Sequence, residues 1–247
     1  MSAKKRLDVA LVERDLVESR AKAQRLILAG QVRVGGRPAA KAGQPVKADD
    51  ILEVRASEQF VSRGGLKLDA ALGHFRISCL NRVCLDLGAS TGGFTDCLLQ
   101  RGARRVFAVD VGKNQIAWKL RTDPRVRLLE KTNARHLNPA LLDEPADLVT
   151  ADVSFISLRK ILPAAARCAR PNADFVALIK PQFEAGREQV GRGGVVRDPA
   201  VHQKVIADIR AFVEENLRAL WRGVMESPLR GPAGNREFLA WFQPGNP

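Results

Sequence analysis

The sequence predicts an α/β fold whose larger part is a mostly parallel, seven-stranded sheet with an antiparallel edge, preceded by a small α+β domain. Three observations support this prediction. Five short apolar runs alternate with helix-compatible stretches, two later apolar runs are joined by a loop too short for a crossover helix, and the first part of the chain has a different pattern. The chain has 247 residues with 45% apolar side chains, which suffices for one or two cores. We expect domains at 1–55 and 63–247, joined by a linker at 56–62.

The charge balance indicates a polyanionic partner. Forty Lys and Arg face 27 Asp and Glu, which leaves a net charge of +13. Nucleic acid is therefore the first expectation and an anionic membrane surface the second. No apolar run reaches the roughly 18 residues of a membrane span, and charges interrupt the first 15 residues. We expect a cytoplasmic protein with four free cysteines, no metal site and no stable membrane association.

The first 55 residues predict two short helices and a small β-structure. Apolar residues at helical spacing in 7–11 indicate the first helix, and the second runs from Ser19, a plausible N-cap, to a stop at Gly30. Val32 and Val34 then alternate before a Gly35–Gly36 turn, and residues 50–54 resemble a strand.

A basic stretch covers the second helix and the following strand. Between Arg20 and Ala48 there are seven basic residues and no acidic one. Such a patch can hold phosphates, although a solvated helix face is the alternative. Residues 6–54 resemble the S4-type RNA-binding domain, and that resemblance favours RNA. The candidate RNA-binding residues are Arg20, Lys22, Arg25, Arg33, Arg37 and, beyond the linker, Arg63.

The remaining chain alternates strands and helices. Expected strands are 83–87, 106–109, 126–129, 148–151 and 175–179, followed by the antiparallel pair 223–225 and 238–242. Expected helices include 93–100, 157–168 and 199–220. This order is typical of a parallel sheet covered by helices on both faces.

A glycine-rich turn follows the first of these strands, from Asp86 to Phe94. Ligands of open α/β sheets bind beyond the carboxyl ends of the strands, where glycines allow close backbone approach. Asp110 ends the second strand, where a carboxylate can accept both hydroxyls of a ribose. Together they predict a nucleoside-containing cofactor. The turn lacks the Lys of a phosphate-binding loop and departs from the G-x-G-x-x-G spacing of NAD sites.

The segment DLGASTGGFTD resembles the first motif of S-adenosylmethionine-dependent methyltransferases, and the resemblance implies their Rossmann-like fold. It also implies that Asp110 holds the cofactor's ribose, that Asn133 lies near its adenine and that Asp152 closes the site. For Asn133 a simple turn role is the alternative. The implied cofactor residues are Asp86, Gly88, Ser90, Gly92, Phe94, Asp110, Asn133 and Asp152.

Methylation of a ribose hydroxyl needs a group that accepts its proton, and a lysine can serve when its surroundings disfavour the ammonium form. Asp152 and Lys180 end neighbouring predicted strands, so the fold itself places them together. The order Lys67, Asp152, Lys180, Glu237 resembles the catalytic set of FtsJ-like ribose methyltransferases. By that resemblance Lys180 removes the proton, Asp152 holds Lys180, and Lys67 and Glu237 position the ribose. Surface ion pairs are the alternative for each one alone.

The whole chain, including its VSRGGLKL junction, resembles the TlyA family of rRNA cytidine 2′-O-methyltransferases, also called haemolysin A. That family implies ribosomal RNA within ribosomes or subunits as the partner. Some relatives carry Arg-x-Trp-Val in the linker, where this chain has residues 58–61 as EQFV, so a switching role of the linker is not expected here. A membrane-active haemolysin and a non-catalytic assembly factor are the other hypotheses. The basic, glycine-rich segment 186–197 is either a mobile flap over RNA or a solvated loop.

Overall fold

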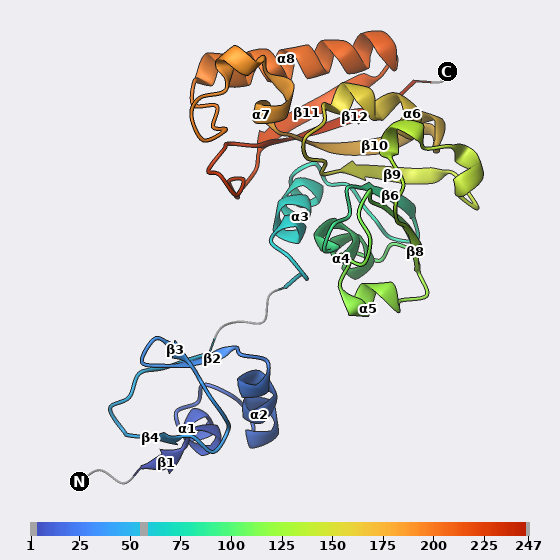
Figure 1. Ribbon diagram of the computed structural model, residues 1–247. Coiled ribbons are helices and arrows are strands. Elements are labelled where there is room, and N and C mark those ends of the chain that lie inside the picture. The colour runs from blue at the N-terminus through green and yellow to red at the C-terminus, as the bar shows by residue number, and fades with distance from the viewer. Residues whose placement is uncertain (1–3, 55–58, 246–247) are drawn as a thin grey trace. The chain divides into compact units, whose positions relative to one another are not determined.

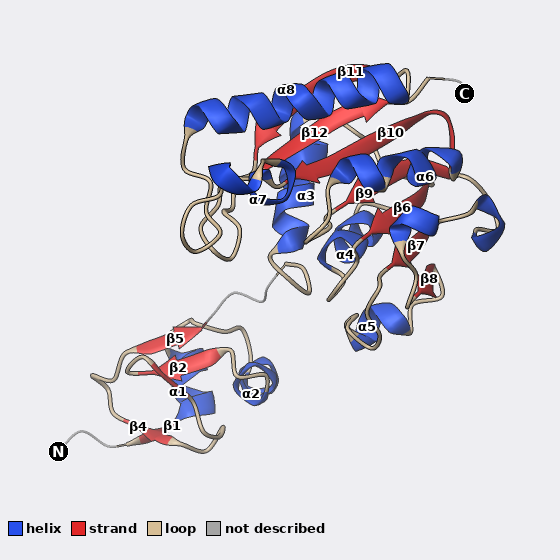
Figure 2. Cartoon of the chain, turned by 45° about the horizontal axis from the view of Figure 1, so that its top comes forward, coloured by secondary structure: helices blue, strands red, loops and turns tan. Residues whose placement is uncertain are grey.

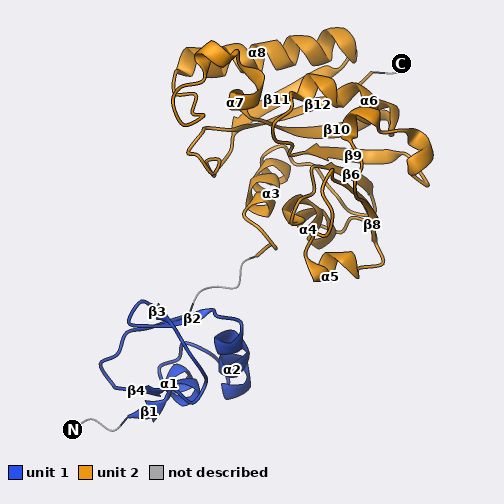
Figure 3. Cartoon of the chain, in the orientation of Figure 1, with its two compact units in different colours: residues 1–58 blue, residues 59–247 orange. Residues whose placement is uncertain are grey.

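The computed structural model describes residues 4–54 and 59–245, which form parts of two compact units, 1–58 and 59–247 (Figure 3). The expected linker is different in the structure. Residues 56–58 lie outside the described part, whereas Phe60 is buried in the core of the second unit. The Val61 N–H donates to Asp96 Oδ2 at 2.8 Å. The second unit therefore begins before residue 63, because an apolar side chain anchors this segment.

The first unit has the predicted helices and strands. Its elements are β1 (Lys5–Arg6), α1 (Leu7–Glu13), α2 (Arg20–Leu28), β2 (Val32–Val34), β3 (Arg37–Pro38), β4 (Pro45–Val46) and β5 (Leu52–Val54). β1 pairs with β4, and β2 lies between β3 and β5, all antiparallel. Ser19 caps α2 by accepting a hydrogen bond from the Lys22 N–H. Apolar residues of α1, α2 and these strands form one small core, among them Leu7, Leu11 and Val32.

The second unit contains the predicted sheet of seven strands (Figure 1). Its strands are β6 (Val83–Leu87), β7 (Arg105–Val109), β8 (Val126–Leu129), β9 (Ala146–Ala151), β10 (Ala169–Ile179), β11 (Leu220–Glu226) and β12 (Phe238–Gln243). Their order is β11-β12-β10-β9-β6-β7-β8. β12 is antiparallel to both neighbours, and the remaining neighbours pair in parallel. The seven-stranded sheet with an antiparallel edge is thus confirmed.

Helices cover both faces of this sheet (Figure 2). They are α3 (Gly64–His74), α4 (Gly93–Gln100), α5 (Trp118–Arg121), α6 (Leu162–Arg167), α7 (Pro181–Glu184) and α8 (Pro199–Asn216), with short 3₁₀ turns at 134–136, 139–141, 158–160 and 187–189. Core residues of α6 and α8 pack on one face, and those of α3, α4 and α5 pack on the other. Side chains alternate along each strand, so the β10 residues Phe175 and Val176 enter different cores.

Two expected boundaries were wrong. The last helix ends at Asn216 rather than 220, because Arg218 adopts a positive φ of 48° and the chain reverses into β11. The helix expected at 157–168 is also shorter in the structure, where α6 begins at Leu162 after a separate 3₁₀ turn. Apolar residues next to each helix pack into the core from turns instead, as Leu217 and Ala219 do after α8 and Leu158 does before α6.

Candidate active site

Two adjoining cavities open at the carboxyl ends of β6, β7, β9 and β10. One, of about 340 Å³, is lined by Lys67, Lys180 and Glu237, and we call it the lysine cavity. The other, of about 580 Å³, is lined by Asp110 and Asn133, and we call it the Asp110 cavity. Both are lined by Gly88, Ser90, Asp152 and Ser154. The cavities therefore meet at the glycine turn after β6 and the loop after β9.

Gly88 allows this meeting. Its φ is +83°, and a Cβ atom there would lie 2.4 Å from the carbonyl oxygen of Asp152. Any side chain would push the β6 turn away from the β9 loop. The Asp152 N–H in turn donates to Leu87 O at 2.9 Å, which ties the two segments together.

Asp110 is held by backbone donors. Its Oδ2 accepts from the Ser90 N–H at 2.8 Å, and its Oδ1 accepts from the Gly112 N–H at 2.7 Å. Each oxygen keeps a lone pair for another donor, so this carboxylate fits a ribose diol. Asn133 lines the same cavity, but its Oδ1 accepts from the Arg135 N–H and caps a 3₁₀ turn. Asn133 therefore has the turn role that the sequence left open, and its Nδ2 donates no hydrogen bond to any of the described residues.

Two expected cofactor residues line neither cavity. Asp86 is completely buried and accepts hydrogen bonds from Thr95 Oγ1 at 2.7 Å and Thr150 Oγ1 at 3.0 Å. Burial raises its pKa to about 6, against the lowering effect of the two hydroxyl donors. Gly92 instead makes room for Leu120. Both residues hold the glycine turn in place without contacting the cavity. Asp86 points from β6 toward α4, and Gly92 lets the turn pack against Leu120.

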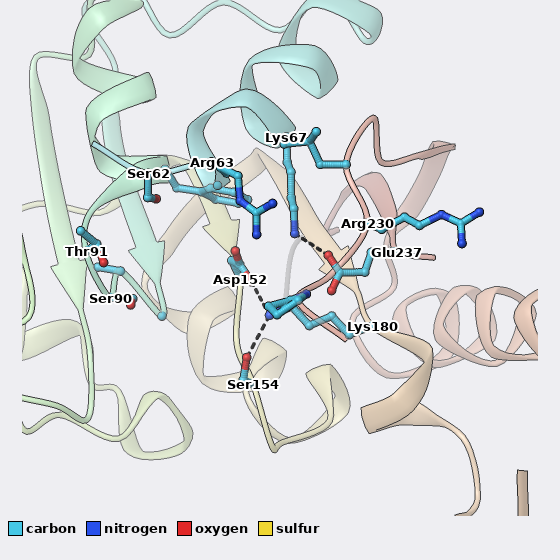
Figure 4. A pocket seen from close by; sticks show the side chains of 17 residues that line it. Ser62, Arg63, Lys67, Ser90, Thr91, Asp152, Ser154, Lys180, Arg230 and Glu237 are labelled. Atoms are coloured by element: carbon cyan, nitrogen blue, oxygen red, sulfur yellow. Dashed lines mark hydrogen bonds and ion pairs between the residues drawn. The ribbon is translucent and has the colours of Figure 1, made fainter. Parts of the chain in front are cut away.

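Lys180 and Asp152 meet in the lysine cavity, as their strand positions predicted (Figure 4). The distance from Lys180 Nζ to Asp152 Oδ1 is 2.5 Å, and the ammonium also donates to Ser154 Oγ at 3.0 Å. The side chain of Lys180 is only 11% exposed. The Lys180 amine is thus held at the surface of the lysine cavity, where the Asp152 carboxylate and the Ser154 hydroxyl orient it.

Lys67 and Glu237 form a second, more deeply buried pair on the same cavity (Figure 4). Lys67 Nζ lies 2.5 Å from Glu237 Oε2, and the side chains are 10% and 1% exposed. Glu237 Oε1 is buried and has no hydrogen-bond partner among the described residues. It is therefore a free acceptor for a donor that enters the cavity, such as a hydroxyl group.

Helix α3 brings Lys67 to the site, and sequence reasoning missed this helix. Its apolar stripe of Leu68, Ala71 and Leu72 is the signal that predicts it, since these residues recur at helical spacing and are buried. The start of α3 packs tightly on the start of α4. A Cβ on Gly93 would lie 2.3 Å from Ser62 Oγ and 2.9 Å from the Gly65 nitrogen.

Other lining residues were also missed. Besides the four expected catalytic residues and the glycine turn at 86–94, the lysine cavity is lined by Arg63, which the sequence assigned to RNA binding, and by Ser62, Gly64, Ser154, Leu229, Arg230 and Pro232. Phe94, an expected cofactor residue, lines this cavity and not the Asp110 cavity. Arg63, expected to contact RNA, is exposed and its guanidinium points toward the cavity in Figure 4.

The expected RNA-binding residues of the first unit fall into two groups. Arg20 donates to the buried Asp8 at 3.2 Å, and Lys22 lies 3.0 Å from Glu18. Arg6 forms the main partner of Asp8 and, with its hydrogen bonds, holds the pKa of that carboxyl well below its usual range. The other expected residues, Arg25, Arg33 and Arg37, take part in none of the ion pairs found among the described residues. This second group is the part of the patch available to phosphates.

Comparison with known protein families divides the chain as the structure does. Residues 60–243 match the model of FtsJ-like methyltransferases, and residues 5–52 match the S4 domain. Among the helices of the described residues, none has the length and apolar character needed to cross a bilayer.

Individual relatives span nearly the whole chain. A 16S/23S rRNA (cytidine-2′-O)-methyltransferase, TlyA of Mycobacterium tuberculosis, is 49% identical over 98% of this chain and 91% of its own length. Hemolysin A of Brachyspira hyodysenteriae is 43% identical over 96% of this chain and 99% of its own length. A solved structure from Streptococcus thermophilus, described as a hemolysin, superimposes with a TM-score of 0.76 at 42% identity, covering 100% of this chain and 90% of that one.

Proposed function

This chain belongs to the FtsJ-like methyltransferase family, in the group that also carries an S4 domain, and we propose that it methylates the ribose 2′-hydroxyl of a cytidine in ribosomal RNA. One observation carries the proposal. Two lysine–carboxylate pairs from four separate segments meet in a cavity that adjoins a second cavity fit for a nucleoside.

S-adenosylmethionine, as the methyl donor, supplies an electrophilic methyl group when bound. In the Asp110 cavity, the Asp110 carboxylate would accept its ribose hydroxyls, and Asn133 would present its amide to the adenine. Gly88, Ser90 and Asp152 line both cavities, so they form the shared wall beside which the donor's methyl group would meet the substrate hydroxyl. Asp86 keeps that wall in place from the core.

In the lysine cavity, Lys180 would remove the proton of the ribose hydroxyl. Once Lys180 has released its own proton to water, its amine would accept the hydroxyl proton while the oxygen bonds to the methyl carbon and the bond from that carbon to the donor's sulfur breaks, leaving a neutral thioether. Asp152 and Ser154 orient Nζ at 2.5 and 3.0 Å and stabilise the ammonium that forms. The free Oε1 of Glu237 would accept a hydrogen bond from the substrate ribose, while Lys67 neutralises the glutamate.

The RNA would be held by basic side chains on both units. Arg25, Arg33 and Arg37 of the first unit contribute phosphate contacts that position the strand, and Arg63 acts at the mouth of the lysine cavity. Ribosomes or their subunits would present this RNA, which places the reaction in the cytoplasm.

A membrane-lytic function is less well supported. The longest described helix, α8, points its apolar stripe of Val205, Ile209 and Val213 into the core of the sheet. That stripe is already packed and has no free apolar face for a bilayer.

The direct test is transfer of labelled methyl groups from S-adenosylmethionine to purified ribosomal subunits, followed by mapping of riboses that resist alkaline cleavage. We expect incorporation at a cytidine, and loss of incorporation in Lys180→Met. Label on a base, or none on any subunit, would contradict the proposed function. Liposomes loaded with dye serve as the parallel assay for lysis, in which we expect no release.

A further inference from the structure

The glycine-rich segment 186–197 is attached to the rest of the second unit by hydrogen bonds to buried side chains and is not a free flap. It follows α7, which starts directly after Lys180. Its far end is folded on itself by a bridge between Gly191 and Val195, with the Gly191 N–H donating to Val195 O at 3.1 Å. The near end of the segment thus continues from α7, and its far end is closed by an internal hydrogen bond.

Asn235 joins this segment to the loop at 227–237. The side chain is 2% exposed, its Nδ2 donates to Gly194 O at 2.8 Å and its Oδ1 accepts from the Val196 N–H at 2.9 Å. Its own carbonyl accepts from the Gly231 N–H at 2.9 Å. One buried amide therefore uses both of its polar ends to connect the two loops, two residues before Glu237.

A second contact supports the same connection from α8. His202 is 2% exposed and its Nε2 lies 3.0 Å from Val196 O. The His202 ring also packs against Phe238, with 5.6 Å between the ring centroids. The end of the glycine-rich segment is consequently held between α8 and the loop that ends in Glu237.

The joined loops carry arginines without acidic partners. Arg192 and Arg197 are exposed on the glycine-rich segment, and Arg230 is exposed on the other loop and lines the lysine cavity. None of the three takes part in an ion pair found among the described residues, whereas Arg236 nearby is paired with Glu226. Unpaired guanidinium groups on a fixed backbone match phosphate oxygens well.

We propose that these two loops form one preassembled rim, held together by Asn235, in which Arg192, Arg197 and Arg230 bind phosphates of the RNA strand beside the target nucleotide. The proposal rests on the proposed function, because it requires that RNA enter the lysine cavity. Asn235 is a positioning residue in it and does not touch the reacting atoms.

The first test removes charge from the rim without touching the cavity. Arg192→Gln with Arg197→Gln should weaken binding to purified ribosomal subunits and raise KM, while kcat stays within about twofold. The slope of log affinity against log salt should become shallower by about 1.4 to 1.8, the value for two lost phosphate contacts. The matched control, Arg167→Gln with Arg210→Gln, removes the same charge from α6 and α8 and should leave the slope unchanged. Equal slopes in both double variants would refute the rim.

The second test concerns Asn235. Asn235→Ala should raise KM for ribosomal subunits by about tenfold and leave the affinity for S-adenosylmethionine unchanged by calorimetry. In the Arg192→Gln, Arg197→Gln background the same change should add little to KM, since the phosphate contacts it positions are already gone. Additive effects, or an effect on kcat alone, would show that Asn235 does not position the rim. If the unaltered protein transfers no methyl group to any subunit, the proposed function fails first, and the salt slopes still decide whether the rim binds RNA.

Discussion

The two units use their charges in opposite ways. In the first unit, one buried acid, Asp8, is contacted by Arg6, Arg20 and Gln24, whereas Arg25 and Arg37 stay exposed. In the second unit, two lysine–carboxylate pairs are withdrawn from solvent into a single cavity.

This difference teaches how each unit is expected to respond to change. Exposed charges act on a polyanion roughly in proportion to their number, and salt screens them. In a buried pair, each charge is stabilised by one specific partner, so the loss of one member leaves a buried charge uncompensated. Graded effects are therefore expected in the first unit and large, specific effects in the second.

The largest effect is expected at Lys180. Lys180→Met removes the proposed proton acceptor, so kcat for methyl transfer should fall by about 10²- to 10⁴-fold. The affinity for S-adenosylmethionine should stay unchanged, because Lys180 does not line the Asp110 cavity. Lys204→Met on the exposed face of α8 is the control. Activity within twofold of the unaltered protein would remove Lys180 from the mechanism.

Loss of one member of the Lys67–Glu237 pair should lower the free energy of unfolding, because the other member is left buried without its partner. Either Lys67→Met or Glu237→Gln leaves one buried group without its partner, and we expect a loss of about 3–5 kcal/mol in the free energy of unfolding. The double variant should be more stable than the less stable single variant, although all three lose activity. Urea unfolding of the set measures this. Additive losses would mean that the two side chains do not interact.

Asp86 should give the second unit a pH dependence opposite in sign to that of Asp8 in the first unit, because the pKa of Asp86 is raised and that of Asp8 is lowered. Its pKa is raised to about 6 by burial, so the folded state holds the proton more tightly than the unfolded state. The free energy of unfolding should therefore fall as pH rises from about 4 to 6, by about 3 kcal/mol, and this contribution should be flat above. Asp86→Asn should lack this slope in urea unfolding measured across that range. If the free energy of unfolding changed with pH in the same way in the unaltered protein and in Asp86→Asn, the pH dependence would not come from Asp86.

The smallest and most graded effect is expected in the first unit. Arg25→Gln with Arg37→Gln should lower RNA affinity about tenfold and flatten its salt dependence, as two lost phosphate contacts require. Arg20→Gln should affect RNA binding less and instead destabilise the first unit, because Arg20 is a partner of Asp8. Filter binding at several salt concentrations and thermal unfolding separate these effects. If Arg20→Gln alone flattens the salt dependence of RNA binding as much as the double variant, then Arg20 contacts phosphates as well, and its separation from Arg25 and Arg37 is wrong.

Much of the fold followed from local patterns. The alternation of apolar runs predicted every strand of the large sheet, and Val83–Leu87 and Val126–Leu129 match their predicted bounds. Helix ends were less accurate, as at Asn216, because Leu217 and Ala219 beyond it pack into the core from the turn before β11. The spacing of apolar residues along the sequence indicates which side chains are buried, but it does not indicate where the backbone turns.

The sequence by itself determined the two-part organisation, the glycine turn and the meeting of Asp152 with Lys180, because neighbouring parallel strands bring their carboxyl ends to one edge. Only the tertiary structure placed Lys67 opposite Glu237, 170 positions later in the chain, and withdrew Asp86 from the cavity. It also joined the glycine-rich segment to Asn235. These contacts depend on how α3 and two loops pack on the sheet, and no spacing along the chain encodes a distance across it.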